Sequence, residues 1–135
     1  MEAVATPRVL LADDHESVLR RVKALLHEFD VVGAVRNGRE AVAQVQRLDP
    51  DVLVIDISMP VLNGLEAASR LQSMHCRTRI VFLTIHEDKD FAAAAFSAGA
   101  SGYVVKSRMC SDLVPAIQEV MQGHRYISKS IPNFL

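Results

Sequence analysis

The stretch Asp51-Val-Leu-Val-Ile-Asp-Ile-Ser-Met-Pro-Val-Leu-Asn-Gly64 decides the fold. It begins with a short apolar run, Val52 to Ile55, and turn-forming residues follow at Met59-Pro60 and Asn63-Gly64. A β-branched run of this length between turn signals predicts a strand buried on both faces, as in a parallel sheet. Asp56 directly follows that strand, and open α/β sheets place their functional groups at the carboxyl ends of strands. We therefore expect Asp56 to lie in a functional crevice.

Further apolar runs alternate with helical patterns on either side of this strand. Together with 52–55, the expected strands cover residues 8–12, 31–35, 79–83 and 101–105. Five strands that alternate with five helices predict a doubly wound α/β domain, in which helices cover both faces of a five-stranded parallel sheet. Right-handed crossovers leave few topologies, and the strand order 2-1-3-4-5 is the common one at this length.

Two asparagines mark the starts of helices. Asn37 precedes Glu40 by three residues, and Asn63 precedes Glu66 by three, which is the spacing of a capping box. Apolar residues at helical spacing follow each asparagine. We therefore expect helices to begin just after Asn37 and just after Asn63.

The end of the chain is harder to interpret. Leu113 and Ile117 belong to a helical stripe, but Pro115 lies inside it. Because proline is tolerated chiefly in the first turn of a helix, we expect this helix to begin near Ser111. Residues 125–135 show no periodic pattern and are expected to be irregular.

The composition argues against several classes of function. A length of 135 residues fits one domain. A net charge of −1 and an aromatic content of 5% give neither a basic surface nor stacking platforms, so this chain alone is not expected to bind DNA. Cys76 and Cys110 lack metal-binding spacing and are expected to be reduced thiols in a cytoplasmic protein. We expect no signal peptide and no membrane span.

Most of the expected strands end in a polar group that can do chemistry: Asp13-Asp14, Asp56, Thr84 and Lys106. Because the carboxyl ends of parallel strands share one edge of the sheet, these groups can converge. Neighbouring carboxylates repel unless a cation lies among them, and Mg²⁺ binds carboxylates while leaving positions for a phosphate. A lysine and a hydroxyl beside the ion suit a transferring phosphoryl group. The pattern predicts that Asp56 is a nucleophile that accepts such a group.

These positions resemble the signature of bacterial response-regulator receiver domains, which have the flavodoxin/CheY-like (βα)5 fold. Four segments are similar to the NarL/FixJ (LuxR-type) branch: Ile57-Ser-Met-Pro60, Leu83-Thr-Ile-His-Glu-Asp88, Gly99-Ala-Ser-Gly-Tyr-Val-Val-Lys106 and Gly123-His-Arg-Tyr-Ile-Ser128. The resemblance runs from about residue 8 to residue 128. It implies a receiver domain over 1–128 and a linker-like tail, 129–135, toward a helix-turn-helix output domain absent from this chain.

The resemblance implies how the phosphoryl group and the metal are held. Asp56 would take a phosphoryl group from the phosphohistidine of a sensor histidine kinase. Mg²⁺ would bind Asp14, Asp56 and the backbone carbonyl of Ser58, and Asp13 would act mainly through water. The chain would then catalyse only its own Mg²⁺-dependent phosphorylation and dephosphorylation, without being an enzyme that acts on an external substrate.

The resemblance also implies a switch. Thr84 would hydrogen-bond the phosphoryl group, Lys106 would pair with it, and Tyr103 would turn inward as Thr84 moves. Many receivers carry a proline in a cis bond after the lysine; Ser107 stands here, which leaves the geometry of that bond open. Ile85 is bulkier than alanine or glycine, and we expect it to shield the acyl phosphate from water.

Partners follow from the same resemblance. They are a sensor histidine kinase, a second copy of the chain in a homodimer formed on phosphorylation, and DNA reached only through the absent C-terminal domain. Transcription regulation by a phosphorelay is the expected role, and no membrane partner is expected. The alternative is a stand-alone single-domain receiver that signals by protein–protein contact.

Other interpretations fit less well. Asp13 or Asp14 could simply cap the next helix. A dehalogenase-like phosphatase needs a second acid two residues after its nucleophile, where this chain has Ser58. A flavin-binding module needs a phosphate loop after the first strand, where the acidic pair would repel phosphate. His15, His75 and His86 show no ligand spacing.

Overall fold

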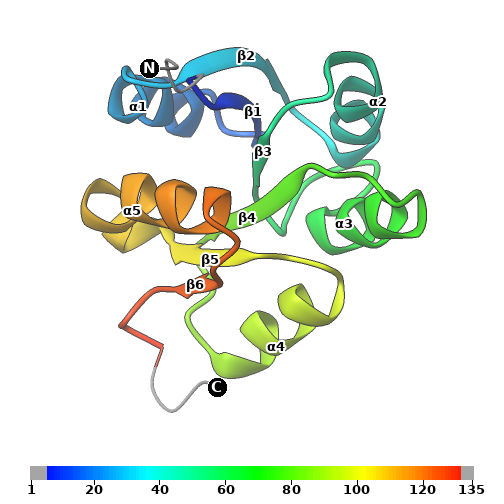
Figure 1. The fold of residues 1–135 in the computed structure, drawn as a ribbon. Coiled ribbons are helices and arrows are strands. Elements are labelled where there is room, and N and C mark those ends of the chain that lie inside the picture. Colours follow the sequence, from blue (N-terminus) through cyan, green and yellow to red (C-terminus); the bar gives the residue numbers. More distant parts are fainter. Residues whose placement is uncertain (1–5, 132–135) are drawn as a thin grey trace.

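A single parallel sheet forms the centre of the computed structural model, which describes residues 6–131 (Figure 1). Its strands lie in the order β2-β1-β3-β4-β5-β6. The elements along the chain are β1 (Arg8–Ala12), α1 (Glu16–Leu25), β2 (Asp30–Val35), α2 (Gly38–Leu48), β3 (Val52–Ile55), α3 (Gly64–Ser73), β4 (Arg79–Thr84), α4 (Lys89–Ser97), β5 (Gly102–Val105), the 3₁₀ turn η1 (Lys106–Arg108), α5 (Met109–Met121) and β6 (Tyr126–Ile127). The predicted fold class and the order 2-1-3-4-5 are confirmed, and a sixth strand is added.

The helices form a layer on each face of the sheet. Helices α1 and α5 cover one face, and α2, α3 and α4 cover the other (Figure 1). The side chains between the layers form two separate hydrophobic clusters, one on each side of the sheet. Within residues 6–131, no helix combines the length and the apolar character needed to cross a membrane.

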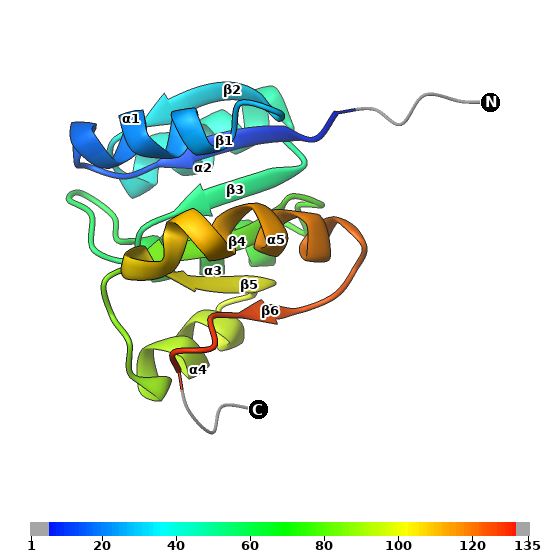
Figure 2. The same cartoon turned by 90° about the vertical axis from the view of Figure 1, so that its left-hand side faces the viewer.

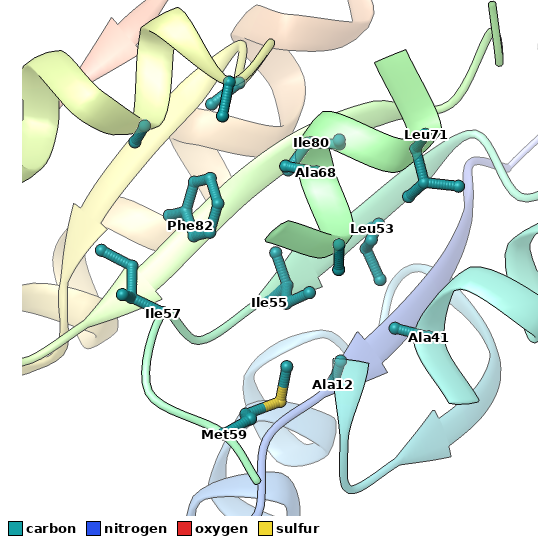
Figure 3. Close-up of a cluster of buried hydrophobic side chains, with 14 of the residues drawn as sticks. Ala12, Ala41, Leu53, Ile55, Ile57, Met59, Ala68, Leu71, Ile80 and Phe82 are labelled. Atoms are coloured by element: carbon teal, nitrogen blue, oxygen red, sulfur yellow. The ribbon is translucent and has the colours of Figure 1, made fainter. Parts of the chain in front are cut away.

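Strand β3 is buried on both faces, as the sequence predicts. Leu53 and Ile55 pack with Phe82 in the cluster beneath α2, α3 and α4 (Figure 3). Val52 and Val54 point into the opposite cluster, beneath α1 and α5. Because successive side chains of a strand alternate between its faces, all four residues of β3 are buried and its backbone is fixed between two cores.

Side-chain caps begin the helices at the predicted asparagines. The Asn63 side chain accepts a hydrogen bond from the Glu66 N–H, and the Glu66 side chain accepts one from the Asn63 N–H, so α3 has a complete capping box. The Asn37 side chain accepts from the Glu40 N–H at 2.8 Å and begins α2. Gly99 has a φ of +104°, which is the left-handed conformation common after the end of a helix.

The predicted start of α5 near Ser111 is wrong. The helix begins at Met109, directly after η1, and Pro115 lies in its interior. Proline there leaves one carbonyl without its helical hydrogen bond. Burial of Leu113 and Ile117 against the sheet opposes that cost, since each fully buried aliphatic side chain contributes about 1.5–3 kcal/mol.

The prediction that residues 125–135 are irregular is also wrong in part. Tyr126 and Ile127 form β6, which runs parallel to β5 at the edge of the sheet (Figure 2). The next residue, Ser128, is fully buried. A strand of two residues is too short to show a period of two, so the sequence carries no signal for it. Residues 132–135 lie outside the described part of the chain.

Candidate functional site

The sheet register brings two acids side by side. Ala12 at the end of β1 pairs with Ile55 at the end of β3, and Asp13 and Asp56 are the next residues of each strand. The Asp56 N–H donates to the Ala12 carbonyl at 3.0 Å, and the Asp13 N–H donates to the Val35 carbonyl at 3.1 Å. The backbone of both acids is therefore held by the sheet, and their side chains are almost fully buried.

Lys106 joins these two carboxylates. Its Nζ lies 3.0 Å from Asp56 Oδ2 and 2.9 Å from Asp13 Oδ2, and only 12% of its side chain is exposed. Burial would lower the pKa of Lys106, but hydrogen bonds and charge attraction from Asp13 and Asp56 outweigh burial and raise it. The ammonium group therefore stays charged at neutral pH and offsets part of the negative charge of the pair.

A third acid and a histidine complete the cluster. His15 Nδ1 lies 3.1 Å from both Asp13 Oδ1 and Asp14 Oδ1. One ligand atom from each of Asp13, Asp14, His15 and Asp56 lies within 4.8 Å of the others. Sequence spacing did not predict that His15 joins the acids. Only the conformation of the loop after β1 brings the three consecutive side chains Asp13, Asp14 and His15 together.

Neither Asp13 nor Asp14 caps the helix that follows them, so the alternative interpretation of this acidic pair as helix caps is wrong. The residue at the N-cap of α1 is His15, and it makes no side-chain capping bond. Asp13 Oδ1 accepts the His15 N–H at 2.9 Å, which closes a turn before the helix begins. Asp14 keeps about one third of its side chain exposed.

The cluster fits a divalent cation with oxygen ligands. It offers three carboxylates, and hard cations such as Mg²⁺ bind carboxylates together with water. Beside it lies a shallow hollow of about 520 Å³ whose lining includes Asp14, Ser58, Asn63 and Phe91. Solvent and a small ligand can therefore reach Asp14, the acid that lines this hollow.

Thr84 lies at the same edge but is held by its own loop. It is fully buried at the end of β4 and pairs with Val105, the residue before Lys106. Its Oγ1 accepts the His86 N–H at 3.4 Å. The hydroxyl is thus at the predicted strand end, where it contacts the loop that follows β4.

Tyr103 points into the molecule. Its side chain is fully buried, and its hydroxyl donates to the His86 carbonyl at 2.9 Å. Burial, with the negative charges of Asp88 and Asp56, raises the pKa of the phenol well above its usual value. The inward position of Tyr103 and the position of the β4–α4 loop are therefore tied by one hydrogen bond.

His86 connects the two loops that border the acids. Its ring stacks on Phe91 with centroids 3.9 Å apart, and its Nε2 lies 3.3 Å from Ser58 Oγ. The Ser58 N–H is in turn 3.4 Å from Asp56 Oδ1. The sequence gave no sign of this role, since it depends on the closeness of two loops that are far apart along the chain.

The loop after β3 requires glycine at its end. A Cβ on Gly64 would lie 2.0 Å from the Asp56 carbonyl oxygen, closer than any real contact. The Gly64 N–H donates to the Ile57 carbonyl at 2.7 Å, which draws the start of α3 against the backbone of Asp56.

The peptide bond between Lys106 and Ser107, whose geometry the sequence left open, is trans. No peptide bond in residues 6–131 is cis.

Residues 9–118 match the family described as the response regulator receiver domain. The chain belongs to this family. Response regulator GacA of Pseudomonas viridiflava is 37% identical over 92% of this chain and 59% of its own length. Response regulator UvrY of Escherichia coli (strain K12) is 36% identical over 91% and 58%. The chain therefore spans about three fifths of the curated relatives that it matches.

A solved structure is similar over nearly the whole receiver domain. It is a two-component response regulator of the LuxR family from Aurantimonas sp. SI85-9A1, with a TM-score of 0.89 and 35% identity. The match covers 94% of this chain and 93% of the other. The predicted resemblance to the LuxR-type branch is confirmed: the chain is a receiver domain of two-component response regulators, which are signalling proteins and not conventional enzymes.

Proposed function

We propose that this receiver domain is a phosphorylation-controlled switch, with Asp56 as the residue that accepts a phosphoryl group from a sensor histidine kinase. One observation carries the proposal. The buried Lys106 ammonium contacts both Asp56 and Asp13 at the carboxyl edge of the sheet, beside a hollow open to solvent. Carboxylates held around a cation, with Asp14 exposed at a hollow beside them, suit transfer of an anionic group.

The proposed reaction uses groups of this chain. A carboxylate oxygen of Asp56 forms a bond to phosphorus while the bond from phosphorus to the donor imidazole nitrogen breaks. Lys106, already paired with Asp56, would neutralise charge on the transferred group, and Thr84 would leave its bond with the His86 N–H to contact the group. Hydrolysis by water later restores the carboxylate.

Asp14, Asp56 and the Ser58 carbonyl would hold Mg²⁺, and Asp13 would act on it mainly through water. When bound, the ion supplies positive charge to the phosphoryl oxygens. Catalysis is limited to self-phosphorylation and autodephosphorylation of the chain. The cytoplasm is the proposed location, where Cys76 and Cys110 would remain thiols.

The proposed output is transcriptional. One relative, 33% identical over 95% of this chain and 56% of its own length, is the transcriptional regulatory protein DegU of Brevibacillus brevis. We infer that residues 129–135 lead toward a helix-turn-helix domain, and that phosphorylation favours a homodimer that places two such domains on DNA.

Incubation with acetyl phosphate and Mg²⁺, followed by intact mass measurement, tests the proposal. We expect a gain of one phosphoryl group, lost when EDTA removes the metal or when Asp56→Asn removes the nucleophile. Asp90→Asn is the matched control, because Asp90 lies in the first turn of α4 and outside the acid cluster. An unmodified wild-type chain, or equal labelling of Asp56→Asn, would refute the proposal.

A further inference from the structure

A hollow of about 280 Å³ lies at the amino ends of the strands, on the edge of the sheet opposite to the acid cluster. Arg79, the first residue of β4, and Ser101, the residue before β5, line one side of it. The turn after α5 lines the other side with His124 and Arg125 (Figure 2). These four residues are here called the basic pocket.

Backbone hydrogen bonds hold the two sides of the basic pocket together. The Ser101 carbonyl accepts the N–H of Tyr126, the residue after Arg125, at 3.1 Å. The Ser101 N–H donates at 2.8 Å to the carbonyl of Ile80, the residue after Arg79. Arg79, Ser101 and Arg125 therefore lie on neighbouring segments whose backbones are fixed by the sheet.

Arg79 has donors that the described part of the chain leaves unused. Its side chain is half-buried, and its guanidinium makes no hydrogen bond or ion pair within residues 6–131. Two other arginines of this edge are satisfied: Arg8 donates to two carbonyls at the end of α2, and Arg77 pairs with Asp49 and Asp51. Because a partly buried charge is normally paired, the free guanidinium of Arg79 points to an anion from outside the chain.

Arg125 brings a second guanidinium that is already positioned. Its Cζ lies 4.6 Å from the centroid of the Phe96 ring, a cation–π contact made through the face of the guanidinium. The N–H donors lie in the plane of the group and are left for an anion. The Ser101 hydroxyl is a further donor without a partner in residues 6–131. Glu119, an acid beside the pocket, is paired with His124 at 2.9 Å.

We propose that the basic pocket binds a small phosphate-bearing anion, either inorganic phosphate or a phosphomonoester. Its lining offers two guanidiniums and a hydroxyl and contains no carboxylate. Guanidiniums bind pairs of phosphate oxygens, and the double charge of phosphate complements two arginines, whereas a single carboxylate would leave one charge uncompensated. The volume lies near the lower limit of small-molecule pockets, roughly 300 Å³, and suits a small anion. This site goes beyond the proposed function and does not depend on it.

Titration of the 135-residue chain with inorganic phosphate, followed by amide NMR spectra, tests the proposal. EDTA is present because a metal ion at the acids would itself attract phosphate, and about 0.15 M NaCl screens exposed charges. We expect saturable shifts of the Ser101, Gly123 and Arg125 amides, with a Kd on the order of 1 mM or tighter. No saturable shift of these amides overturns the proposal.

A second titration, with glycerol 3-phosphate, distinguishes the two sources of the anion. Tighter binding of the ester than of inorganic phosphate assigns the pocket to a phosphomonoester. Equal or weaker binding of the ester assigns it to inorganic phosphate.

Arginine variants test whether the pocket itself holds the anion. Arg79→Gln and Arg125→Gln should each weaken phosphate binding about tenfold, because each removes charge-assisted hydrogen bonds. Arg79→Lys keeps the charge without the paired donors and should recover part of the loss. Arg20→Gln is the matched control, since it removes the same charge from an exposed position on α1, outside the pocket.

Thermal unfolding shows which of these variants are folded, and the exposed Arg125 provides the test if Arg79→Gln does not fold. Equal weakening in Arg20→Gln and in the pocket variants overturns the proposal. Undiminished phosphate binding in the folded pocket variants does so as well.

Discussion

Val61 is held in a backbone conformation that its side chain disfavours. It has a φ of +69° in the loop between Asp56 and α3, and its side chain is 68% exposed. A β-branched residue in the left-handed region is strained, at a cost of order 1–3 kcal/mol. Glycine adopts this conformation freely but loses more conformational entropy on folding. That entropy loss offsets about 0.5–1 kcal/mol of the stability gained by relieving the strain.

Val61→Gly should therefore raise the free energy of unfolding by about 1 kcal/mol. Urea unfolding gives the value. Val61→Ala keeps a Cβ, so its free energy of unfolding should rise less than that of Val61→Gly. It serves as the matched control. A Val61→Gly protein less stable than Val61→Ala would show that the strain is not relieved.

Ile85 is the residue-scale candidate for control of phosphoryl lifetime. It follows Thr84 directly and is 69% exposed, so its truncation should cost little stability. If it shields the acyl phosphate, Ile85→Ala should speed dephosphorylation about two- to tenfold, equivalent to roughly 0.4–1.4 kcal/mol of barrier. The readout is phosphate loss after removal of acetyl phosphate, and an unchanged rate would end the shielding idea.

Single residues differ in how far the sequence predicts their surroundings. The closeness of Asp13, Asp56 and Lys106 was predictable, because the ends of parallel strands meet at one edge of a sheet. The position of His15 over the acids and that of His86 over Ser58 were not. Both depend on loop conformations that local patterns do not encode.

At the scale of elements, the start of α3 and the end of β3 are packed too closely for a side chain. Gly64→Ala would place a Cβ against the Asp56 carbonyl and force the backbones apart. We expect a loss of about 1–3 kcal/mol in the free energy of unfolding and slower labelling by acetyl phosphate. Gly33→Ala is the control, since its Cβ would meet only the ends of two flexible side chains, Leu10 at 3.2 Å and Leu48 at 3.6 Å. Equal losses in both would contradict the close-packing argument.

The junction of α5 with residues 126–128, where Asp112 accepts a hydrogen bond from Ser128, should respond to acid. The folded chain holds the pKa of Asp112 below its usual value, so the ionised form stabilises the fold above about pH 4, and that stability is lost as the pH falls through the folded pKa. Asp112→Asn should lower the free energy of unfolding at pH 7 by about 1–3 kcal/mol.

The difference between wild type and Asp112→Asn should shrink as the pH falls below about 4, because the unfolded chain then binds a proton at Asp112 while the folded chain does not. It should vanish below the folded pKa, where both side chains are neutral. Urea unfolding between pH 7 and pH 3.5 measures it. Glu119→Gln, at an exposed pair with His124, should have little effect at any pH. A difference that stays constant with pH would assign the effect of Asp112 to packing alone.

Elements in which apolar residues repeat with a clear period were predictable from the sequence, and short elements were not. The strands and the capped helices follow from apolar spacing and from turn residues on either side. The start of α5 was missed because burial of its apolar face outweighs the local preference of Pro115. β6 was missed because its place depends on the buried Ser128 and not on any repeat.

At the scale of the whole molecule, the sheet serves as a frame that brings distant residues to one edge. Asp13, Asp56 and Lys106 span most of the chain, yet they meet because β1, β3, β4 and β5 are neighbours in the sheet. β6 pairs with β5, the strand that ends directly before Lys106.

The position of the phosphoryl group is the most direct test of this account. After labelling with acetyl phosphate and Mg²⁺, borohydride reduction converts a phosphorylated aspartate to homoserine, and peptide mass mapping then finds the altered residue. The account predicts homoserine at position 56 alone. Homoserine at Asp13, at Asp14 or outside the cluster, with Asp56 unchanged, would contradict it.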